Sequence, residues 1–309
     1  MANYITVDGG TTNTRLYLVK NRCVVDTLKL TVGAGNGKAA LTEAIRDAIK
    51  ALLEKNAMTE QDIVRVLASG MITSEYGLCA LPHLTVPAGR KELHEAMHEV
   101  VLEEITTVPF VFLRGVKTDC ADAQSADMMR GEETELFGIL QNTDKDCLYV
   151  LPGSHSKLIT VDCMGRIVDF STMMTGEMAA ALSQHTILKD AVALSGSELD
   201  IEYLARGYED CKKNGINHTL FRTRVMKNLF GVDPNARYSY FIGAILQAEI
   251  DAIIESPATR VILGGQKQLR LAMAALLKQY AQKEIVTLSD EDVGASVVKG
   301  AIAIYEKGE

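Results

Sequence analysis

The segment YITVDGGTTNTRLYLVK (4–20) decides which fold we expect for this chain. Its two ends, Tyr4–Val7 and Arg15–Lys20, are apolar and favour β-strands, and the small polar turn DGGTTNT (8–14) joins them. A third such run, Cys23–Leu30, follows after a two-residue turn. The chain is therefore predicted to open with three strands joined by hairpin turns.

This pattern of strand, turn, strand, turn and strand returns later in the chain. The second copy has its strands at 148–152, 158–162 and 166–170, with turns at 153–156 and around Gly165. Two copies of one hairpin-rich unit predict two similar lobes. We expect an N-terminal lobe at 1–145 and a C-terminal lobe at 146–290, with a C-terminal helix at 291–309 packed back on the first lobe.

The remaining elements follow from the spacing of apolar residues. Helices are predicted at 38–55, 91–105, 127–141, 176–188, 196–214, 217–229, 235–255, 267–282 and 291–306. Further strands are predicted at 63–68, 110–113, 260–263 and 285–288, and residues 71–90 are expected to form a loop. This order predicts an α/β protein.

The composition of the 309 residues is that of a globular protein, with 47% hydrophobic and 23% charged residues. A formal net charge of -8 argues against nucleic acid or an anionic membrane as the main partner. The six cysteines include no CxxC pair, which indicates reduced thiols in a cytoplasmic protein. The longest apolar helical stretch, Tyr240–Ile254, contains polar and acidic residues and is not expected to span a bilayer.

The turn at 8–14 has the composition of a phosphate-binding loop. Gly10 lets backbone N–H groups approach a phosphate closely, and Thr11, Thr12 and Asn13 can donate hydrogen bonds to its oxygens. Asp8 stands at a strand end, where its carboxylate could hold Mg²⁺ directly or through water. The alternative is a β-turn whose side chains bond only to their own backbone.

Two later segments also contain glycine at a strand end. LPGSHSK (151–157) places small polar residues before Lys157, a cation that could neutralise a phosphate. A polar hairpin with an exposed lysine is the alternative. Gly264 and Gly265 stand between a buried strand and a helix, where the backbone could lie against a nucleotide and the helix start favours anions. Close packing of that strand on the helix would also need glycine.

The segment MRGEETELFG (129–138) places several acids at the start of a helix. Glu133 shares a helical face with Leu136 and Phe137, so burial is expected to raise its pKa toward the range useful for a general base. Glu132 lies at the edge of that face and is the second choice. Stabilisation of the helix dipole explains Glu132 well but Glu133 less well.

Two other motifs fit known sites poorly. HEAMH (94–98) matches the HExxH zinc pattern and would place His94 and His98 on one helix face, but the acids beside it favour a solvated face. GAGNGK (33–38) has the spacing of neither a P-loop nor GxGxxG, and we expect a loop near a ligand.

Together these segments resemble the 2-dehydro-3-deoxygalactonokinase family, within the actin–hexokinase–heat-shock ATPase superfamily. The matching strings are VDGGTTNTR (7–15), ASGMITSEYG (68–77), LPHLTVPAG (81–89), MRGEETELFG (129–138), LPGSHSKLITVD (151–162) and DFSTMMTGEM (169–178). The pair RGEETEL and PGSHSK is the most specific. Two departures are Gly9, where the family usually has Trp, and Ser154, where Thr is common.

The resemblance implies a two-lobed actin-like ATPase (ribonuclease H-like) fold, with mixed sheets flanked by helices and a nucleotide cleft between the lobes. It also implies an ATP-dependent kinase that phosphorylates the C6 hydroxyl of 2-dehydro-3-deoxy-D-galactonate in sugar-acid catabolism. Asp8 would organise Mg²⁺, and Glu133, or else Glu132, would accept the substrate proton.

The resemblance assigns further residues to the two ligands. Those expected to bind ATP are Gly10, Thr11, Thr12, Asn13, Gly153, Ser154, His155, Ser156, Lys157, Gly264, Gly265 and Gln266. Those expected to bind the sugar acid are Arg15, Gly35, Gly70, Met71, Ser74 and Arg130. Arg15, Arg130 and Lys157 are the cations considered for its carboxylate.

Other functions stay open at this point. A kinase for a related sugar or sugar acid, an exopolyphosphatase-like phosphatase of the same fold, and a filament protein that binds nucleotide without much turnover would share these turns. We expect a small-molecule substrate and no nucleic-acid or membrane partner. The preferred epimer and the oligomeric state, including a homo-oligomer, are left open.

Overall fold

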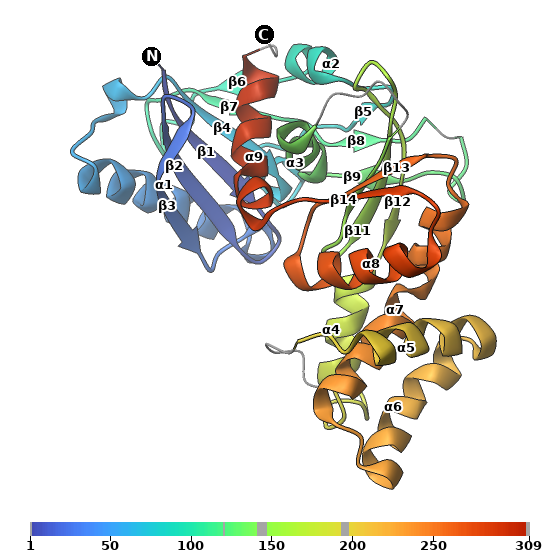
Figure 1. Ribbon diagram of the computed structural model, residues 1–309. Helices are drawn as coiled ribbons and strands as arrows, with labels where there is room; N and C mark the ends of the chain where they lie inside the picture. Colours follow the sequence, from blue (N-terminus) through green and yellow to red (C-terminus); the bar gives the residue numbers. More distant parts are fainter. Residues whose placement is uncertain (1, 120, 141–146, 193–197, 307–309) are drawn as a thin grey trace. The chain divides into compact units, whose positions relative to one another are not determined.

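A computed structural model describes residues 2–119, 121–140, 147–192 and 198–306 (Figure 1). The chain divides into two compact units. Unit 1 comprises residues 1–143, 162–169 and 289–309, and unit 2 comprises residues 144–161 and 170–288. The lobe boundary expected near residue 145 lies outside the described residues.

Unit 1 is built on a six-stranded sheet that contains the predicted opening hairpins. Across the sheet, its strands are β3 (Cys23–Leu30), β2 (Thr14–Lys20), β1 (Asn3–Gly9), β4 (Arg65–Gly70), β7 (Phe110–Phe112) and β6 (His98–Val100). β1 pairs antiparallel with β2 and parallel with β4, so that Gly9 lies opposite Gly70. Both glycines therefore stand at the ends of neighbouring strands.

Helix α1 (Lys38–Lys55) confirms its prediction to the residue. Its apolar stripe includes Leu41, Ile45 and Leu52, which are fully buried in one cluster with Ile5 and Leu16 of the sheet. Burying each such side chain contributes about 1.5–3 kcal/mol relative to leaving it exposed.

The acidic segment forms helix α3 (Glu132–Ile139), which packs on helix α9 (Asp290–Tyr305) (Figure 1). The two backbones touch at glycines. A Cβ atom on Gly138 would lie 1.8 Å from the carbonyl oxygen of Ser296, and one on Gly300 would lie 1.8 Å from that of Thr134. The close approach to α9 therefore fixes the position of α3.

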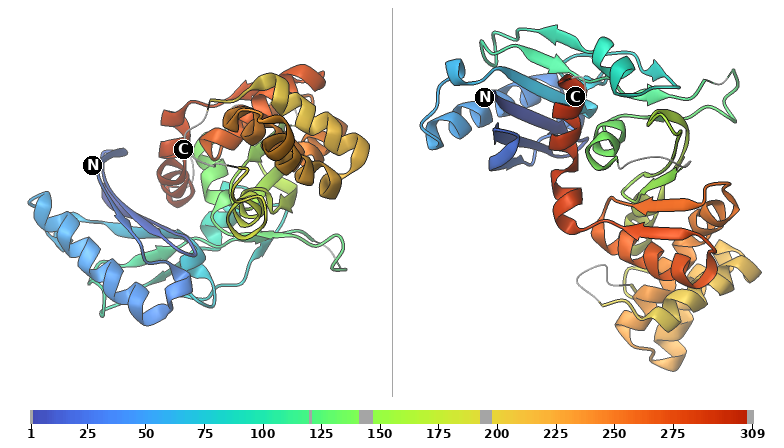
Figure 2. Two further views of the ribbon diagram at one scale, coloured as in Figure 1. Left: turned by 90° about the horizontal axis from the view of Figure 1, so that it is seen from below. Right: turned by 45° about the horizontal axis from the view of Figure 1, so that its top comes forward.

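The first strand, β1, and the last helix, α9, belong to unit 1, and Figure 2 shows the ribbon from two further directions. The Tyr4 hydroxyl donates to Glu306 at 3.1 Å, and the Tyr4 ring meets the Tyr305 ring edge-on, with 5.7 Å between their centroids. These contacts hold the C-terminal end of α9 against β1.

The prediction of a helix at 91–105 is wrong. Helix α2 (Arg90–Glu95) ends early, and β6 then pairs antiparallel with β7, with Val100 opposite Phe110. The β-branched end of this stretch gains more from joining the sheet than from continuing the helix. His94 and His98 therefore lie on different elements rather than on one helix face.

The predicted helix at 127–141 starts later than expected, and its last predicted residue lies outside the described residues. Gly131 has φ of +115°, which is outside the helical region, so α3 begins after it. Before it, a small three-stranded sheet consists of β5 (Leu84–Thr85), β8 (Val116–Lys117) and β9 (Met128–Met129). β5 lies within the predicted 71–90 loop, which also holds the short 3-10 helix η3 (Met71–Thr73).

Unit 2 repeats the strand arrangement of unit 1. Its sheet consists of β12 (Ile167–Met173), β11 (Ser156–Val161), β10 (Cys147–Leu151), β13 (Arg260–Leu263) and β14 (Glu284–Thr287). β10 pairs antiparallel with β11 and parallel with β13, just as β1 pairs with β2 and β4. The predicted repetition of the hairpin-rich unit is confirmed.

Helices make up the rest of unit 2. They are α4 (Thr175–His185), α5 (Ile201–Asn214), α6 (Ile216–Phe230), α7 (Pro234–Glu255) and α8 (Lys267–Tyr280). All five are predicted, with shifted ends, and residues 196–197 of the predicted 196–214 helix lie outside the described residues. Among the residues described, every helix is too short or too polar to cross a bilayer.

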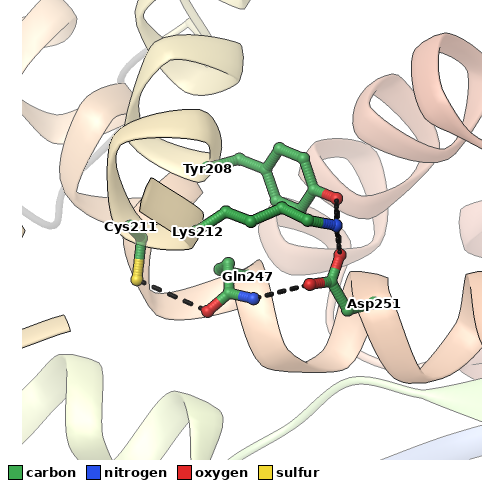
Figure 3. A network of polar contacts seen from close by, with 5 residues as sticks. All are labelled: Tyr208, Cys211, Lys212, Gln247 and Asp251. Atoms are coloured by element: carbon green, nitrogen blue, oxygen red, sulfur yellow. Dashed lines mark hydrogen bonds and ion pairs between the residues drawn. The ribbon is translucent and has the colours of Figure 1, made fainter. Parts of the chain in front are cut away.

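A polar network ties α5 to α7 (Figure 3). Asp251 accepts hydrogen bonds from Tyr208 at 2.5 Å, Lys212 at 2.9 Å and Gln247 at 2.8 Å. Partial burial raises the pKa of Asp251, but these donors outweigh burial and hold it below its ordinary value. The Cys211 thiol donates to the side-chain oxygen of Gln247 at 3.6 Å. The contacts of Asp251 with Tyr208 and Lys212 join the two helices.

Candidate active site

The turn at 8–14, which is predicted to bind phosphate and is called the first phosphate turn below, lies between β1 and β2 in unit 1. The Gly10 N–H donates to the Asn13 carbonyl at 2.8 Å, which closes the turn. Thr11 and Thr12 are exposed at its tip, and the Asn13 amide donates to the Thr12 hydroxyl at 2.9 Å. The two threonine hydroxyls therefore remain open to a ligand, although one already accepts a hydrogen bond.

A second loop braces this turn. The N–H groups of Ala34 and Gly35 donate to the carbonyls of Gly10 and Thr11 at 3.0 and 2.8 Å. A Cβ atom on Gly33 would lie 2.6 Å from the Gly10 oxygen, so only glycine fits there. The loop at 33–38 thus binds two carbonyl groups of the turn. It also brings Gly35, predicted to bind the sugar acid, into contact with Thr11, predicted to bind ATP.

Three glycines bring β1, β4 and α3 together. Gly70 has φ of +83°, and a Cβ atom there would lie 2.5 Å from the Gly9 oxygen. A Cβ atom on Gly131 would lie 3.2 Å from the Cα of Gly70. The acidic helix therefore begins directly beside the strand ends that carry Asp8 and Gly70. At Gly9 itself, a Cβ atom would lie 2.7 Å from the Cβ of Ile72, so this fold leaves little room for a side chain there.

Glu133 is fully buried, as its helical face predicts. The Gly131 N–H donates to its two carboxyl oxygens at 2.9 and 2.8 Å, and the Thr134 hydroxyl donates to one of them at 3.2 Å. Burial raises the pKa of Glu133 to about 8, and the charge of Glu132 adds to this effect. Glu133 therefore carries a proton at neutral pH.

Glu132 is half-buried and lies in the electrostatic field of Asp8. Burial raises the pKa of Asp8, the Arg15 guanidinium opposes this, and Glu132 raises it further. The Arg15 Nη1 lies 3.4 Å from the Asp8 carboxylate. In the described part of the chain, no three His, Cys, Asp or Glu side chains lie where they could hold a metal. A cation here would need oxygens from a ligand or from water.

Arg130 ties the loop after β4 to the start of α3. Its Nη1 donates to the Thr73 carbonyl at 2.8 Å and to the Thr73 hydroxyl at 2.6 Å, and its Nη2 donates to the Leu81 carbonyl at 3.0 Å. The His83 ring lies 3.2 Å from Nη2, and burial together with Arg130 and Lys117 lowers the pKa of His83 to about 4. A neutral His83 can therefore stand beside the guanidinium.

Three further residues expected to bind the sugar acid, Gly70, Met71 and Ser74, lie at this end of β4. Gly70 accepts a hydrogen bond from the Thr73 hydroxyl at 3.0 Å, and Ser74 donates to the Met71 carbonyl at 2.7 Å. Met71 and Ser74 are half-buried. Unit 1 thus brings the predicted residues from four separate segments into one region.

The turn at 153–156, which is also predicted to bind phosphate and is called the second phosphate turn below, joins β10 to β11 in unit 2. Ser154 and His155 are exposed, whereas Ser156 and Lys157 are buried. The Gly153 N–H lies 3.4 Å from the Ser156 hydroxyl, and the Lys157 ammonium lies 3.3 Å from the His155 carbonyl. The lysine is therefore packed beneath the turn and is not the exposed residue of a simple polar hairpin.

The Gly264–Gln266 segment lies directly against this turn. The Gln266 N–H donates to the Pro152 carbonyl at 2.6 Å, and a Cβ atom on Gly265, which has φ of +65°, would lie 2.4 Å from the same oxygen. The Gln266 side chain caps α8 by accepting from the Leu269 N–H at 3.0 Å. Unit 2 thus brings its two predicted nucleotide segments together.

Sequence reasoning missed several residues that shape these turns. Gly131 and Thr73 hold the acidic helix and the β4 loop, and Gly176 and Glu177 contact the second turn. All four lie within or beside the quoted strings, but nothing in their spacing shows what they touch. Their roles depend on contacts between segments that are distant in sequence.

Comparison with known proteins identifies the family. A family model described as 2-keto-3-deoxy-galactonokinase matches residues 8–300. The 2-dehydro-3-deoxygalactonokinase of Escherichia coli (strain K12) is 27% identical over 281 residues, which is 88% of this chain and 89% of the relative. The family expected from the sequence motifs is confirmed.

Solved structures show the fold. A candidate 2-dehydro-3-deoxygalactonokinase from Sinorhizobium meliloti has a TM-score of 0.78 at 23% identity, covering 98% of this chain and 97% of that one. The activator of 2-hydroxyisocaproyl-CoA dehydratase from Clostridium difficile, solved with bound ADPNP, has a TM-score of 0.50 at 13% identity, covering 99% of this chain and 95% of that one. The predicted actin-like ATPase fold class is confirmed.

Proposed function

This chain belongs to the 2-keto-3-deoxy-galactonokinase family, and we propose that it transfers the γ-phosphoryl group of ATP to the C6 hydroxyl of 2-dehydro-3-deoxy-D-galactonate. The observation that carries this proposal is the family match over residues 8–300, because it includes both phosphate turns and the acidic helix. Phosphoryl transfer needs groups that position the phosphates, neutralise their charge and orient the nucleophile, and these segments offer such groups.

The segments predicted to bind ATP supply its contacts. Thr11, Thr12 and Asn13 of the first turn, with the Gly10 backbone, contact the phosphates, as do Gly153–Lys157 of the second turn. Gly264–Gln266 contact the adenosine. Exposed hydroxyls and a glycine-braced backbone in the first turn, and a buried lysine beneath the second, support this assignment. Such groups neutralise and orient a phosphoryl group without large rearrangement.

Glu132 accepts the proton of the attacking alcohol. The C6 oxygen forms a bond to the γ-phosphorus while the bond from that phosphorus to the β–γ bridging oxygen breaks, and the proton of the C6 hydroxyl passes to the Glu132 carboxylate. Glu132 is favoured over Glu133 because it is half-buried, whereas Glu133 is fully buried and protonated at neutral pH. Glu133 instead holds the first turn of α3 in place through the Gly131 N–H.

Asp8 would hold Mg²⁺, with Glu132 nearby. Magnesium commonly uses one or two carboxylates and completes its shell with water and phosphate oxygens, which agrees with the small donor set here. The raised pKa of Asp8, caused first by burial and also by Glu132, indicates carboxylates that a cation would stabilise. When bound, the metal would neutralise charge on the β- and γ-phosphates.

Arg15 recognises the substrate carboxylate. Its side chain is 51% exposed and contacts Asp8 at 3.4 Å and the Tyr17 hydroxyl, so about half of its surface is open to an anion. Arg130 already donates to Thr73 and Leu81 from both terminal nitrogens, which favours a role in shaping the site with Gly35, Gly70, Met71 and Ser74. A planar guanidinium suits bidentate binding of a carboxylate.

An ADP-release assay tests the proposed activity. The purified chain is given ATP, Mg²⁺ and a panel of sugars and sugar acids that includes both epimers of 2-dehydro-3-deoxy-hexonate. We expect fast ADP release with the galactonate-derived acid and little release without an acceptor. Equal release with and without acceptors would instead indicate a phosphatase, and release only with neutral sugars would indicate a different kinase.

A further inference from the structure

The start of helix α4 forms hydrogen bonds with the second phosphate turn. The N–H groups of Gly176 and Glu177 donate to the carbonyls of Gly153 and Ser154, each at 3.0 Å. A Cβ atom on Gly176 would lie 2.5 Å from the Gly153 oxygen, so the contact requires glycine. The first turn of α4 thereby fixes two successive carbonyls of the phosphate turn.

The same turn of α4 also contacts the imidazole of the phosphate turn. The His155 Nε2 lies 2.5 Å from a Glu177 carboxylate oxygen, and both side chains are 52% exposed. To donate this hydrogen bond, Nε2 must carry a proton, which leaves Nδ1 to face outside groups. The exposed histidine of the turn is therefore held by its far nitrogen.

A free carboxylate beside a triphosphate would repel it. Glu177 can be tolerated beside an ATP site because its carboxylate is paired with the His155 ring. Because both side chains are exposed, the pair contributes little to the free energy of unfolding. Its geometry instead determines the direction in which the His155 ring points.

We infer that Glu177 and Gly176 are positioning residues for ATP: Gly176 fixes the backbone of the second phosphate turn, and Glu177 orients His155 toward the phosphates. This inference rests on the proposed use of the second turn for ATP. Neither residue needs to touch the sugar acid or the C6 hydroxyl.

A double-mutant cycle in ATP binding tests the role of Glu177. Binding of a non-hydrolysable ATP analogue is measured by calorimetry for the wild type, Glu177→Ala, His155→Ala and the double variant. Exposed ion pairs contribute at most about 1 kcal/mol, so we expect Glu177→Ala to weaken binding about threefold to fivefold. In the His155→Ala background the same change should leave binding unchanged or strengthen it, because only the repulsion is removed.

A purely structural role for Glu177 makes a different prediction. It would weaken analogue binding equally in both backgrounds and lower the melting temperature. Either that result, or unchanged binding in Glu177→Ala, would overturn the inference. Glu202→Gln, on the exposed first turn of α5, is the charge-matched control and should bind the analogue like the wild type.

Kinetics separate this inference from the proposed function. In Glu177→Ala, the KM for ATP should rise about threefold to fivefold, while kcat and the KM for the sugar acid should stay within about twofold of the wild type. Gly176→Ala should raise the KM for ATP further, and Gly294→Ala, which meets no atom within 4 Å, is its control. If the wild type binds the analogue but phosphorylates no sugar acid, the proposed function fails, and the binding cycle still decides the role of Glu177.

Discussion

At the scale of single residues, two neighbouring acids at the start of α3 have different environments. Glu132 is half-buried beside Asp8, whereas Glu133 is fully buried and its pKa is about 8. We therefore expect Glu132→Gln to lower kcat by about 100-fold or more, and Glu133→Gln to lower it much less. Steady-state assays with Glu135→Gln as the control on the same helix measure this. The reverse order of effects would make Glu133 the base.

Asp8 is the residue that we propose to bind magnesium. Asp8→Asn keeps the size of the side chain but removes its charge. The Mg²⁺ concentration that gives half-maximal activity should therefore rise by about tenfold or more. A Mg²⁺ titration of the initial rate at saturating ATP provides the measurement. If the variant responds to Mg²⁺ like the wild type, Asp8 does not hold the metal.

Glu249 on α7 should make folding stability depend on pH. It is 1% exposed, and in the described part of the chain no group makes a well-formed hydrogen bond with either of its oxygens. Burial raises its pKa from 4.5 to about 8, and the Ser156 hydroxyl offsets this only in part. The folded protein thus keeps a proton that an unfolded chain releases near its ordinary pKa.

Between these two pKa values the unfolded state binds fewer protons, so the free energy of unfolding falls as pH rises. Glu249→Gln removes this effect, and its stability relative to the wild type should increase from pH 5 to pH 8 by on the order of a few kcal/mol. Urea unfolding at several pH values measures the difference. Glu255→Gln, at the exposed end of the same helix, should follow the wild type, and a parallel curve for Glu249→Gln would contradict the prediction.

At the scale of elements, the contact between α3 and α9 positions the acids. Gly300→Ala would place a Cβ atom 1.8 Å from the Thr134 oxygen, one residue after Glu133. We expect this overpacking to cost about 1–3 kcal/mol of stability and to lower kcat, because α3 must shift. Gly294→Ala on the same helix faces open space and should be neutral or stabilising. Thermal unfolding and kcat of both variants test this, and equal behaviour would show that the contact does not position α3.

The helices and strands also show which local features of the sequence predict secondary structure correctly. Helix α1 is predicted to the residue because its apolar stripe and its boundary glycine agree. The stretch from Lys91 is misassigned because its helical spacing competes with pairing to β7, which lies further along the chain. The start of α3 is missed because it depends on the positive φ of Gly131 against Gly70, a contact that local sequence does not contain.

At the scale of the whole molecule, the repeated hairpin unit predicts the topology of both sheets, since β10, β11 and β13 repeat the pairing of β1, β2 and β4. The motifs also predict the family. Sequence reasoning finds the turns because their composition is local. It cannot find Gly176 and Glu177, which act through contacts with a turn about 20 residues earlier that only folding creates.

The most direct test of the central claim is to identify the product. The chain is incubated with ATP and 2-dehydro-3-deoxy-D-galactonate, and the product is analysed by ³¹P–¹H correlation NMR. We expect one new phosphomonoester whose phosphorus couples to the two C6 protons, with one ADP formed for each. Inorganic phosphate without an ester, or coupling to a proton at another carbon, would contradict a kinase that acts on the C6 hydroxyl.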